Sequence, residues 1–238
     1  MNPEELQQLA AQQGVILTPE QMHQLQVYNQ LLNEANQVMN LTAITDSDQV
    51  YLKHFYDSLT PLFVQPQLAQ PVSLIDIGSG AGFPGLVLKI ANPQLQLTLV
   101  DSLNKRINFL KTLVQRLHLT DVTLIHQRAE DLGHQKQYRE HFDFATARAV
   151  ASLPTLLELC LPTVKVGGQF IALKATKTAA EVAAAQKALH ILGGQVHQIQ
   201  AFSLPHDAGQ RELVLINKIS TTPTKYPRKP GTPSREPL

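Results

Sequence analysis

A glycine-rich turn that follows a short apolar run is the feature that most limits how this chain can fold. The run Leu74–Ile77 contains one acidic residue, Asp76, and leads into Gly78-Ser79-Gly80-Ala81-Gly82-Phe83-Pro84-Gly85. Glycines in such a turn let the backbone adopt positive φ angles and approach a ligand closely. In open α/β sheets the ligand lies beyond the carboxyl ends of the strands, near the point where the strand order reverses. The turn therefore predicts a ligand-binding α/β sheet.

From residue 72 onward, strand-like and helical segments alternate. Strands are predicted at 72–77, 95–100, 122–125, 142–147 and 170–173. Helices are predicted at 86–90, 103–117, 153–164 (ended by Gly167-Gly168) and 179–192. This alternation indicates a parallel sheet with helices on both faces, a three-layer α/β/α, Rossmann-like fold. Two further strands, 195–202 and 211–218, have no helix between them and predict a terminal antiparallel strand pair.

Composition divides the chain into three regions. Residues 1–70 are predicted to form a helical N-terminal extension, in which Thr18-Pro19-Glu20-Gln21 marks a helix start with a hydroxyl cap and an early proline. Residues 71–219 hold the sheet. Residues 220–238 contain five prolines and a net charge of +3. A segment of this composition cannot build a core of its own, so we expect a basic, proline-rich C-terminal arm.

Overall charge and cysteine content exclude several classes of protein. The chain has 20 Lys and Arg against 19 Asp and Glu, so any contact with nucleic acid must be local. The single cysteine, Cys160, excludes an internal disulfide framework, and the histidines show no metal-ligand spacing. No run reaches the roughly 18 apolar residues of a membrane span, and the acidic N-terminus is not a signal peptide. We expect a cytoplasmic chain, with no metal and no membrane partner, and we favour a monomer.

An acidic residue about twenty positions after the turn favours a nucleoside-containing cofactor. Asp101 ends the second predicted strand, where a carboxylate can bind a ribose diol. The G-x-G-x-x-G pattern of NAD-binding proteins fails in either register: from Gly80 it places Gly78-Ser79 inside the strand, and from Gly78 it ends on Phe83. Asp76 can hold a water or the amine of an amino-acid-like ligand. These features favour S-adenosylmethionine (SAM); NAD, or a turn that binds nothing, are the alternatives. The candidate cofactor-binding residues are Asp76, Gly78, Gly80, Gly82 and Asp101.

Motifs along nearly the whole chain resemble one family, the ribosomal small-subunit methyltransferase G family, also known as GidB. The resemblance implies a class I SAM-dependent methyltransferase that methylates N7 of a guanine, at the ribosomal position numbered 527, in bacterial 16S rRNA. It also implies SAM contacts at Gly78, Phe83, Ala129, Glu130 and Arg148. The matching segments are Asn40–Ile44, Lys53–Leu59, Asp76–Gly85, Lys105–Ile107, Phe109-Leu110, Arg128–Glu130, Ala147–Ala151 and Lys225–Pro233.

The chemistry of such a reaction agrees with the absence of an evident acid–base pair. Guanine N7 carries a lone pair and no proton, so the enzyme only has to align the nucleophile with the methyl group. Methylation of a pyrimidine C5 would need a cysteine nucleophile, but Cys160 lies in an apolar run and is expected to be buried. No catalytic residue is therefore predicted, unless Arg148 binds the base at O6 or holds the methionyl carboxylate of SAM. A surface ion pair of Arg148 is the alternative.

Two further groups of residues are candidates for RNA contacts. On one short helix, Lys53 with Asp57 and His54 with Ser58 are four residues apart; they form either a polar rim that positions the base or a solvated face with a salt bridge. The second group is basic and follows phosphates, unless it is merely solvated: Lys105 and Arg106 after Asp101, and Lys225, Tyr226, Arg228 and Lys229 in the arm. Deleting the residues after Ser220 is then expected to spare cofactor binding. A small-molecule methyltransferase and a non-catalytic nucleotide-binding module are the alternative functions.

Overall fold

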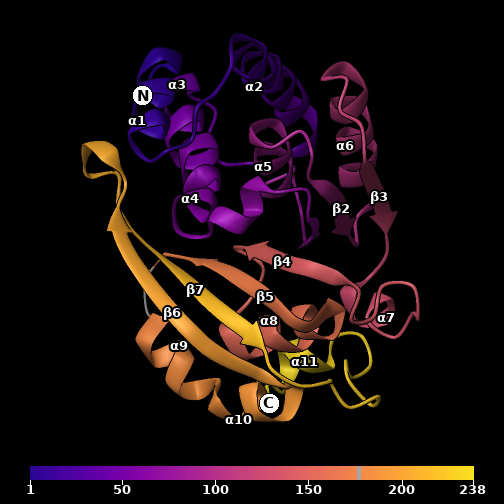
Figure 1. The fold of residues 1–238 in the computed structure, drawn as a ribbon. Coiled ribbons are helices and arrows are strands. Elements are labelled where there is room, and N and C mark those ends of the chain that lie inside the picture. Colours follow the sequence, from indigo (N-terminus) through magenta and orange to yellow (C-terminus); the bar gives the residue numbers. More distant parts are fainter. Residues whose placement is uncertain (176–177) are drawn as a thin grey trace.

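The computed structural model describes residues 1–175 and 178–238 and contains a seven-stranded sheet (Figure 1). The strands are β1 (Ser73–Ile77), β2 (Gln96–Asp101), β3 (Val122–His126), β4 (Phe142–Arg148), β5 (Val164–Lys174), β6 (Gly194–Ser203) and β7 (Gln210–Lys218). They are ordered β3-β2-β1-β4-β5-β7-β6. The pairs among β1 to β5 are parallel, whereas β7 is antiparallel to both β5 and β6. The predicted terminal antiparallel pair is confirmed, and the strand order reverses between β1 and β4.

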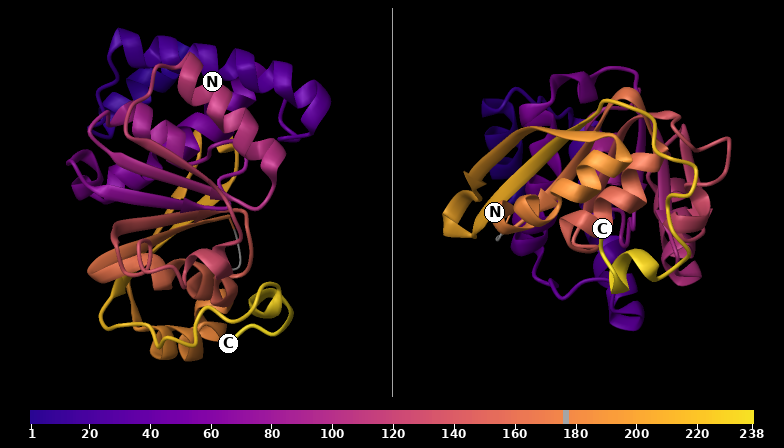
Figure 2. Two further views of the ribbon diagram at one scale, coloured as in Figure 1. Left: turned by 90° about the vertical axis from the view of Figure 1, so that its right-hand side faces the viewer. Right: turned by 90° about the horizontal axis from the view of Figure 1, so that it is seen from below.

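Helices cover both faces of the sheet, as Figure 2 shows from two further sides. One face carries α1 (Pro3–Gln12), α2 (Pro19–Met39), α3 (Ser47–Val50), the π-helix η1 (Tyr51–Tyr56), α4 (Asp57–Val64), η2 (Pro66–Ala69), α5 (Gly85–Ala91) and α6 (Asn104–Arg116). The other carries α7 (Ala129–Leu132), α8 (Leu153–Cys160), η3 (Leu161–Thr163), α9 (Thr178–Ala184), α10 (Gln186–Leu192) and α11 (Thr232–Arg235). The short helix η4 (Pro205–Asp207) connects β6 to β7. A separate hydrophobic core fills each side, so the predicted three-layer α/β/α fold with a helical N-terminal extension is confirmed.

The N-terminal helices pack directly on the glycine turn. The predicted start of α2 is confirmed: Thr18 Oγ1 accepts the amide of Gln21, whose side chain accepts the amide of Thr18. Further along α2, the hydroxyl of Tyr28 donates to the carbonyl of Ala81 at 2.6 Å. A Cβ at Gly82 would lie 2.5 Å from that hydroxyl oxygen, so only glycine allows the helix this close. The extension therefore shapes the turn, and Gly82 serves this contact.

Two predicted helix boundaries are wrong. The glycines at 167 and 168 do not end a helix, because α8 stops at Cys160 and β5 begins at Val164. They lie where the register between β4 and β5 shifts, and a Cβ at Gly168 would lie 2.5 Å from the carbonyl oxygen of Asp143. The predicted helix 179–192 is divided at Ala185 into α9 and α10, and the single turn α7 was not predicted.

The C-terminal segment, residues 220–238, does not project as the expected basic arm: it is folded against the α7–α8 side of the molecule (Figure 2). Tyr226 is only 7% exposed and belongs to the hydrophobic core between the sheet and α8. The guanidinium of Arg228 donates to the carboxylate of Glu158 at 2.7 Å, and Arg139 donates to the carbonyl of Tyr226 at 2.8 Å. The sequence shows the charges of this segment but not the acidic partner and the carbonyls that it meets across the fold.

None of the helices in the described ranges 1–175 and 178–238 is both long enough and apolar enough to cross a membrane.

Candidate active site

The first of two neighbouring cavities lies at the carboxyl ends of β1 and β2 and has a volume of about 390 Å³. Four of the predicted cofactor-binding residues line it: Gly78, Asp101, Ala129 and Glu130. Its wall also includes Ser102, Arg106, Arg128, Ala149, Val150 and Ser234. We call it the cofactor cavity below. It lies next to the point where the strand order reverses, as the turn predicted.

The glycine turn is fixed to the end of β2. Gly78 and Gly80 have φ angles of +72° and +58°, and the amide of Gly80 donates to Asp101 Oδ2 at 3.0 Å. A Cβ at Gly78 would lie 2.6 Å from Cγ2 of Val150, so glycine is required there by both conformation and space. The turn thus presents bare backbone to the cofactor cavity.

Asp101 is held in place from three directions. Besides Gly80, the amide of Leu103 donates to its Oδ1 at 2.9 Å, and Arg106 Nη1 lies 3.2 Å from its Oδ2. A carboxylate offers about four lone-pair sites, so three are used. One site therefore remains for a ligand hydroxyl, and a second becomes free if Arg106 turns away.

Asp76 is fully buried at the end of β1 and does not line the cavity wall. Its Oδ2 accepts the amide of Gly85 at 3.0 Å, whereas its Oδ1 has no hydrogen-bond partner among the described residues. Burial raises the pKa of Asp76 to about 7. The Thr146 hydroxyl, which is paired with Asp76 across β1 and β4 and is also buried without a partner, can supply the donor that this oxygen needs, as can a water or an ammonium group.

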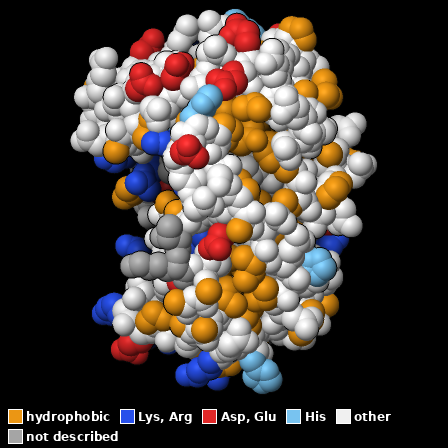
Figure 3. Space-filling view, turned by 90° about the vertical axis from the view of Figure 1, so that its left-hand side faces the viewer, with side chains coloured by type: hydrophobic (Ala, Val, Ile, Leu, Met, Phe, Trp, Pro, Cys, Tyr) orange, Lys and Arg blue, Asp and Glu red, His pale blue; other side chains and the backbone are white. Residues whose placement is uncertain are grey.

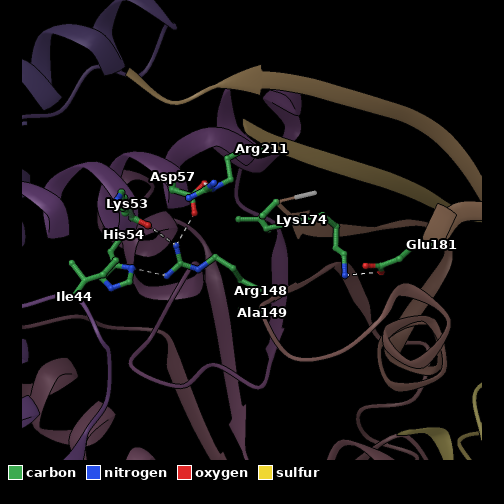
Figure 4. Close-up of a pocket in the computed structure, with 11 residues that line it drawn as sticks. Ile44, Lys53, His54, Asp57, Arg148, Ala149, Lys174, Glu181 and Arg211 are labelled. Atoms are coloured by element: carbon green, nitrogen blue, oxygen red, sulfur yellow. Dashed lines mark hydrogen bonds and ion pairs between the residues drawn. The ribbon is translucent and has the colours of Figure 1, made fainter. Parts of the chain in front are cut away.

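The second cavity has a volume of about 440 Å³ and is the candidate site for a substrate; it is named the substrate cavity (Figure 4). Ala149 lines both cavities, so they adjoin at this residue. Its polar side chains, drawn in Figure 4, come from η1, α4, β4, β5, α9 and β7. The residues that line it are Ile44, Lys53, His54, Asp57, Arg148, Ala149, Leu173, Lys174, Ala175, Glu181 and Arg211.

Asp57 binds two arginines at once in this cavity. Its Oδ2 lies 2.9 Å from Arg148 Nη1, and its Oδ1 lies 3.2 Å from Arg211 Nε. Lys53 and Asp57 do not form the salt bridge that was one of the two alternatives for this helix; instead, the backbone carbonyl of Lys53 accepts from Arg148 at 3.3 Å. Residues four apart do not line up here, because η1 has the wider i→i+5 pattern of a π-helix. For the same reason Ser58 lies at 0% exposure, away from the rim.

An aromatic stack supports Arg148 from below. Phe83 lies between Tyr28 and His54, with ring centroids at 5.3 and 4.5 Å, and the guanidinium carbon of Arg148 is 4.9 Å from the Phe83 centroid. The Phe83 side chain is 6% exposed and lines neither cavity. An aromatic face stabilises a cation above it, so the stack fixes the guanidinium in one plane.

His54 is held as a neutral imidazole. Burial and the nearby Arg148 lower its pKa to about 3. Its Nδ1 accepts from Arg148 Nη2 at 3.2 Å, so the proton is assigned to Nε2, which donates to Thr42 Oγ1 at 2.8 Å. Both ring nitrogens are engaged, and His54 therefore positions Arg148 and does not act as an acid or a base.

The remaining predicted residues lie outside both cavities. Gly80 and Gly82 support the turn, and Lys105 on α6 donates to the carbonyl of Met39 at 3.3 Å. In the C-terminal segment, Lys225 and Lys229 are exposed, while Tyr226 and Arg228 are engaged in the fold. The sequence analysis missed Arg211, Lys174, Glu181, Val150 and Ser234 among the lining residues. Arg211 stands 154 positions from Asp57, and only the antiparallel placement of β7 beside β5 brings it to the cavity.

No group of three or more His, Cys, Asp or Glu side chains that could hold a metal ion occurs in the described part of the chain.

Comparison with known proteins identifies relatives over the full length of the chain. A family model for the rRNA small subunit methyltransferase G proteins (GidB) matches residues 21–214. Proteins named ribosomal RNA small subunit methyltransferase G from Lactiplantibacillus plantarum and Staphylococcus aureus (strain Newman) are 55% and 52% identical. Both alignments cover 100% of this chain, with 98% and 99% of the respective relative.

Solved structures with the same fold are more distant in sequence. A SAM-dependent O-methyltransferase from Thermotoga maritima has a TM-score of 0.54 at 17% identity, covering 81% of this chain and 72% of that one. A ribosomal protein L11 methylase from Lactobacillus delbrueckii has a TM-score of 0.53 at 13% identity, covering 71% and 80%. These similarities confirm the Rossmann-like fold.

Proposed function

The chain belongs to the rRNA small subunit methyltransferase G family, and from this premise we propose that it transfers a methyl group from SAM to N7 of a guanine in 16S rRNA. The observation that carries the proposal is the pair of cavities that meet at Ala149. The cofactor cavity is lined by the glycine turn and the buried acids Asp101 and Glu130. The substrate cavity is lined mainly by cationic side chains. A cofactor in the first and a nucleotide in the second would face each other across one residue.

The cofactor cavity and the buried acid beside it fit SAM. Asp101 has a lone-pair site left for a ribose hydroxyl, and Ala129 and Glu130 line the part of the cavity beyond it. Because Asp76 lies behind the cavity wall, its Oδ1 would reach the α-ammonium of the methionyl group through a water. When bound, SAM supplies an electrophilic methyl group on a sulfonium. The positive charge of NAD⁺ is on a pyridinium nitrogen that has no N–H to donate to Asp76, whereas SAM has an α-ammonium, and this favours SAM over the dinucleotide.

Arg148 is placed to contact the cofactor, the base, or both. Its guanidinium gives Nη1 to Asp57 and to the Lys53 carbonyl, and one Nη2 hydrogen to His54. Of the five N–H groups of an arginine, one Nη2–H and the Nε–H therefore have no acceptor among the described residues. They can donate to the methionyl carboxylate or to guanine O6, but not to N7, because that would occupy the attacking lone pair.

The substrate cavity supplies no evident general base, and N7 methylation needs none. The three candidates are all engaged: His54 is neutral with both nitrogens bonded, Asp57 holds two guanidiniums, and Glu181 is paired with Lys174 at 2.7 Å. The chain's task is then alignment of the base with the methyl group. Removing a proton from an exocyclic amine or a hydroxyl would need a base that these residues do not provide.

The face shown in Figure 3 supports a polyanionic substrate, since Lys and Arg side chains gather along one edge of it. Lys53, Lys174 and Arg211 line the substrate cavity. Lys174 is paired with Glu181 and Arg211 with Asp57, so Lys53 is the cavity lysine without an ion pair among the described residues that can neutralise a phosphate beside the nucleotide. A substrate inside the ribosome also implies a cytoplasmic location.

The test is methyl transfer from labelled SAM to three acceptor pools: unmethylated small ribosomal subunits, free 16S rRNA and a metabolite extract. We expect label in 16S rRNA, recovered as 7-methylguanosine after digestion. Label only in the metabolite pool would make the protein a small-molecule methyltransferase. SAM binding without transfer to any pool would make it a nucleotide-binding module.

A further inference from the structure

We propose that the C-terminal segment, residues 220–238, forms one wall of the cofactor cavity, and that docking of this segment and binding of the cofactor stabilise each other. Glu130 and Arg228 are the positioning residues of this coupling. The inference rests on the proposed function for the identity of the cofactor, SAM. It reverses the sequence-based expectation that the segment serves RNA alone and can be deleted without affecting cofactor binding.

The segment is anchored where it leaves β7. Thr222 Oγ1 donates to the carbonyl of Leu192 at 2.8 Å, and the amide of Thr222 donates to Glu140 at 2.7 Å. The guanidinium of Arg139 then donates to the carbonyls of Thr222 and Tyr226 at 2.7 and 2.8 Å. These bonds fix the path of the segment toward α7.

The strongest contact of the segment is an ion pair with a buried acid. Glu158, on α8, has 0% exposure. Its carboxylate accepts Arg228 Nε at 2.9 Å and Nη2 at 2.7 Å, and also the backbone amide of Arg228 at 2.7 Å. A buried carboxylate without a cation is strongly unfavourable, so Glu158 holds the segment in its docked position.

Beyond this ion pair the segment reaches the cofactor cavity. The amide of Gly231 donates to Glu130 Oε1 at 2.8 Å, the carbonyl of Pro233 accepts from Thr155 at 2.9 Å, and Ser234 lines the cavity wall. Glu130 lines the same cavity. One side of Glu130 therefore faces the segment and the other side belongs to the cofactor site.

The helix that carries Glu130 depends on the segment. With four residues, α7 is too short to be stable alone. The chain after it rests on the segment: His134 donates to the carbonyl of Pro227 at 2.6 Å, and a Cβ at Gly133 would lie 2.7 Å from the Pro227 ring. If the segment undocks, α7 loses these supports and the Ala129–Glu130 wall of the cavity loosens.

Coupling of this kind is reciprocal: a segment that tightens SAM binding must itself be held more tightly when SAM is bound. Coupling free energies between sites typically correspond to factors of about 5 to 150. We expect a factor of about ten here, since the segment contributes one wall and the rest of the cavity is built on the sheet.

The first arm of the test compares two arginine substitutions in the full-length protein. Arg228→Ala removes the ion pair with Glu158, whereas Arg235→Ala removes an exposed arginine with no ion pair among the described residues. Isothermal titration with SAM should give an Arg228→Ala Kd about tenfold weaker than wild type, and an Arg235→Ala Kd within twofold. Glu130→Ala, which keeps the ion pair, should also weaken binding. Thermal unfolding without ligand establishes that each variant is folded.

The second arm uses wild-type protein and measures trypsin cleavage after Lys225 and Arg228. Saturating SAM should slow this cleavage about tenfold, the same factor as in the first arm, because cleavage requires the undocked state. If the segment only stabilised the fold, its substitution would lower the unfolding temperature, but the change in SAM Kd and the change in cleavage rate would not agree. Unchanged SAM affinity in folded Arg228→Ala and Glu130→Ala, or equal cleavage with and without SAM, would overturn the coupling. A wild-type protein that does not bind SAM would overturn the proposed function as well.

Discussion

Replacing Gly78 by alanine tests the geometry of the glycine turn most directly. At φ +72° any residue with a Cβ pays about 1–2 kcal/mol relative to glycine. The added Cβ would also lie 2.6 Å from Cγ2 of Val150, but this side chain is 39% exposed and can shift, so the contact costs at most about 1 kcal/mol, the low end for overpacking. We therefore expect the free energy of unfolding to fall by about 1–3 kcal/mol. Because Val150 lines the cofactor cavity, SAM affinity should fall at least about tenfold, or about 1.4 kcal/mol.

Gly14 provides a matched control. It has a similar φ of +83°, but a Cβ there would meet no heavy atom within 4 Å. Gly14→Ala should show the conformational cost alone, about 1–2 kcal/mol in urea unfolding, with unchanged SAM affinity. Val150→Ala on the Gly78→Ala background should restore part of both losses, and the double-mutant cycle isolates the contact between the two positions. If Gly78→Ala binds SAM like wild type and unfolds like Gly14→Ala, the close approach of Gly78 and Val150 is refuted.

Three further substitutions test the buried acids and His54. Asp57→Asn should lower the free energy of unfolding in urea by about 3 kcal/mol, the low end for a broken buried ion pair, because both guanidiniums keep some access to water. The same variant should lower kcat/KM for rRNA at least tenfold, and an unchanged kcat/KM would contradict the positioning role of Asp57. Burial raises the pKa of Asp76 to about 7, so between its ordinary pKa and 7 the folded state binds more protons than the unfolded state, and stability should fall as pH rises through that window. SAM should bind more tightly as pH rises from 6 to 8, because its ammonium needs the ionised acid. Asp76→Asn should abolish both trends. His54, with a pKa lowered to about 3, should make the wild type lose stability as pH falls from 6.5 toward 3. Urea unfolding of His54→Gln should show a smaller loss over this range, because groups such as Asp143 still contribute; an equal loss in both proteins would refute the burial of a neutral imidazole.

The fold could be predicted from the sequence because its signals are local. The apolar run before Gly78, the capping box at Thr18 and the alternation of strands with helices each depend on a few neighbouring residues, and all are confirmed. The glycines at 167 and 168 misled the prediction, because a strand irregularity and a helix end both favour glycine. Only the pairing of β4 with β5 distinguishes the two.

The site could be predicted in part. Gly78 and Asp101 could be predicted from the pattern, because each stands at the carboxyl end of a parallel strand and such ends meet at one edge, whereas Ala129 and Glu130 were implied only by the family resemblance; all four line one cavity. Arg211 could not be found in this way. It comes from the antiparallel strand at the far end of the chain, and no local pattern distinguishes it from other surface arginines.

In contrast to Arg211, the ion pair between Arg228 and Glu158 could have been proposed from the sequence on physical grounds. Glu158 stands in the run Leu156-Leu157-Glu158-Leu159-Cys160-Leu161, so a helix there buries it whichever face points inward. A buried carboxylate needs a cation, and arginine matches it with two parallel hydrogen bonds. The basic C-terminal segment offers arginines at 228 and 235, so a contact between that segment and this helix follows as one of few solutions.

This pairing also changes what the segment can offer to RNA. Arg228 is neutralised in place, whereas Lys225 and Lys229 remain exposed. If the two lysines each contact a phosphate, replacing one by alanine should reduce the slope of log K for rRNA against log salt by about 0.7–0.9, as counterion release requires. Arg228→Ala should leave that slope unchanged while weakening SAM binding. A slope that falls equally for Arg228→Ala and Lys229→Ala would mean that the ion pair opens on RNA, and that the docked segment is not the RNA-bound state.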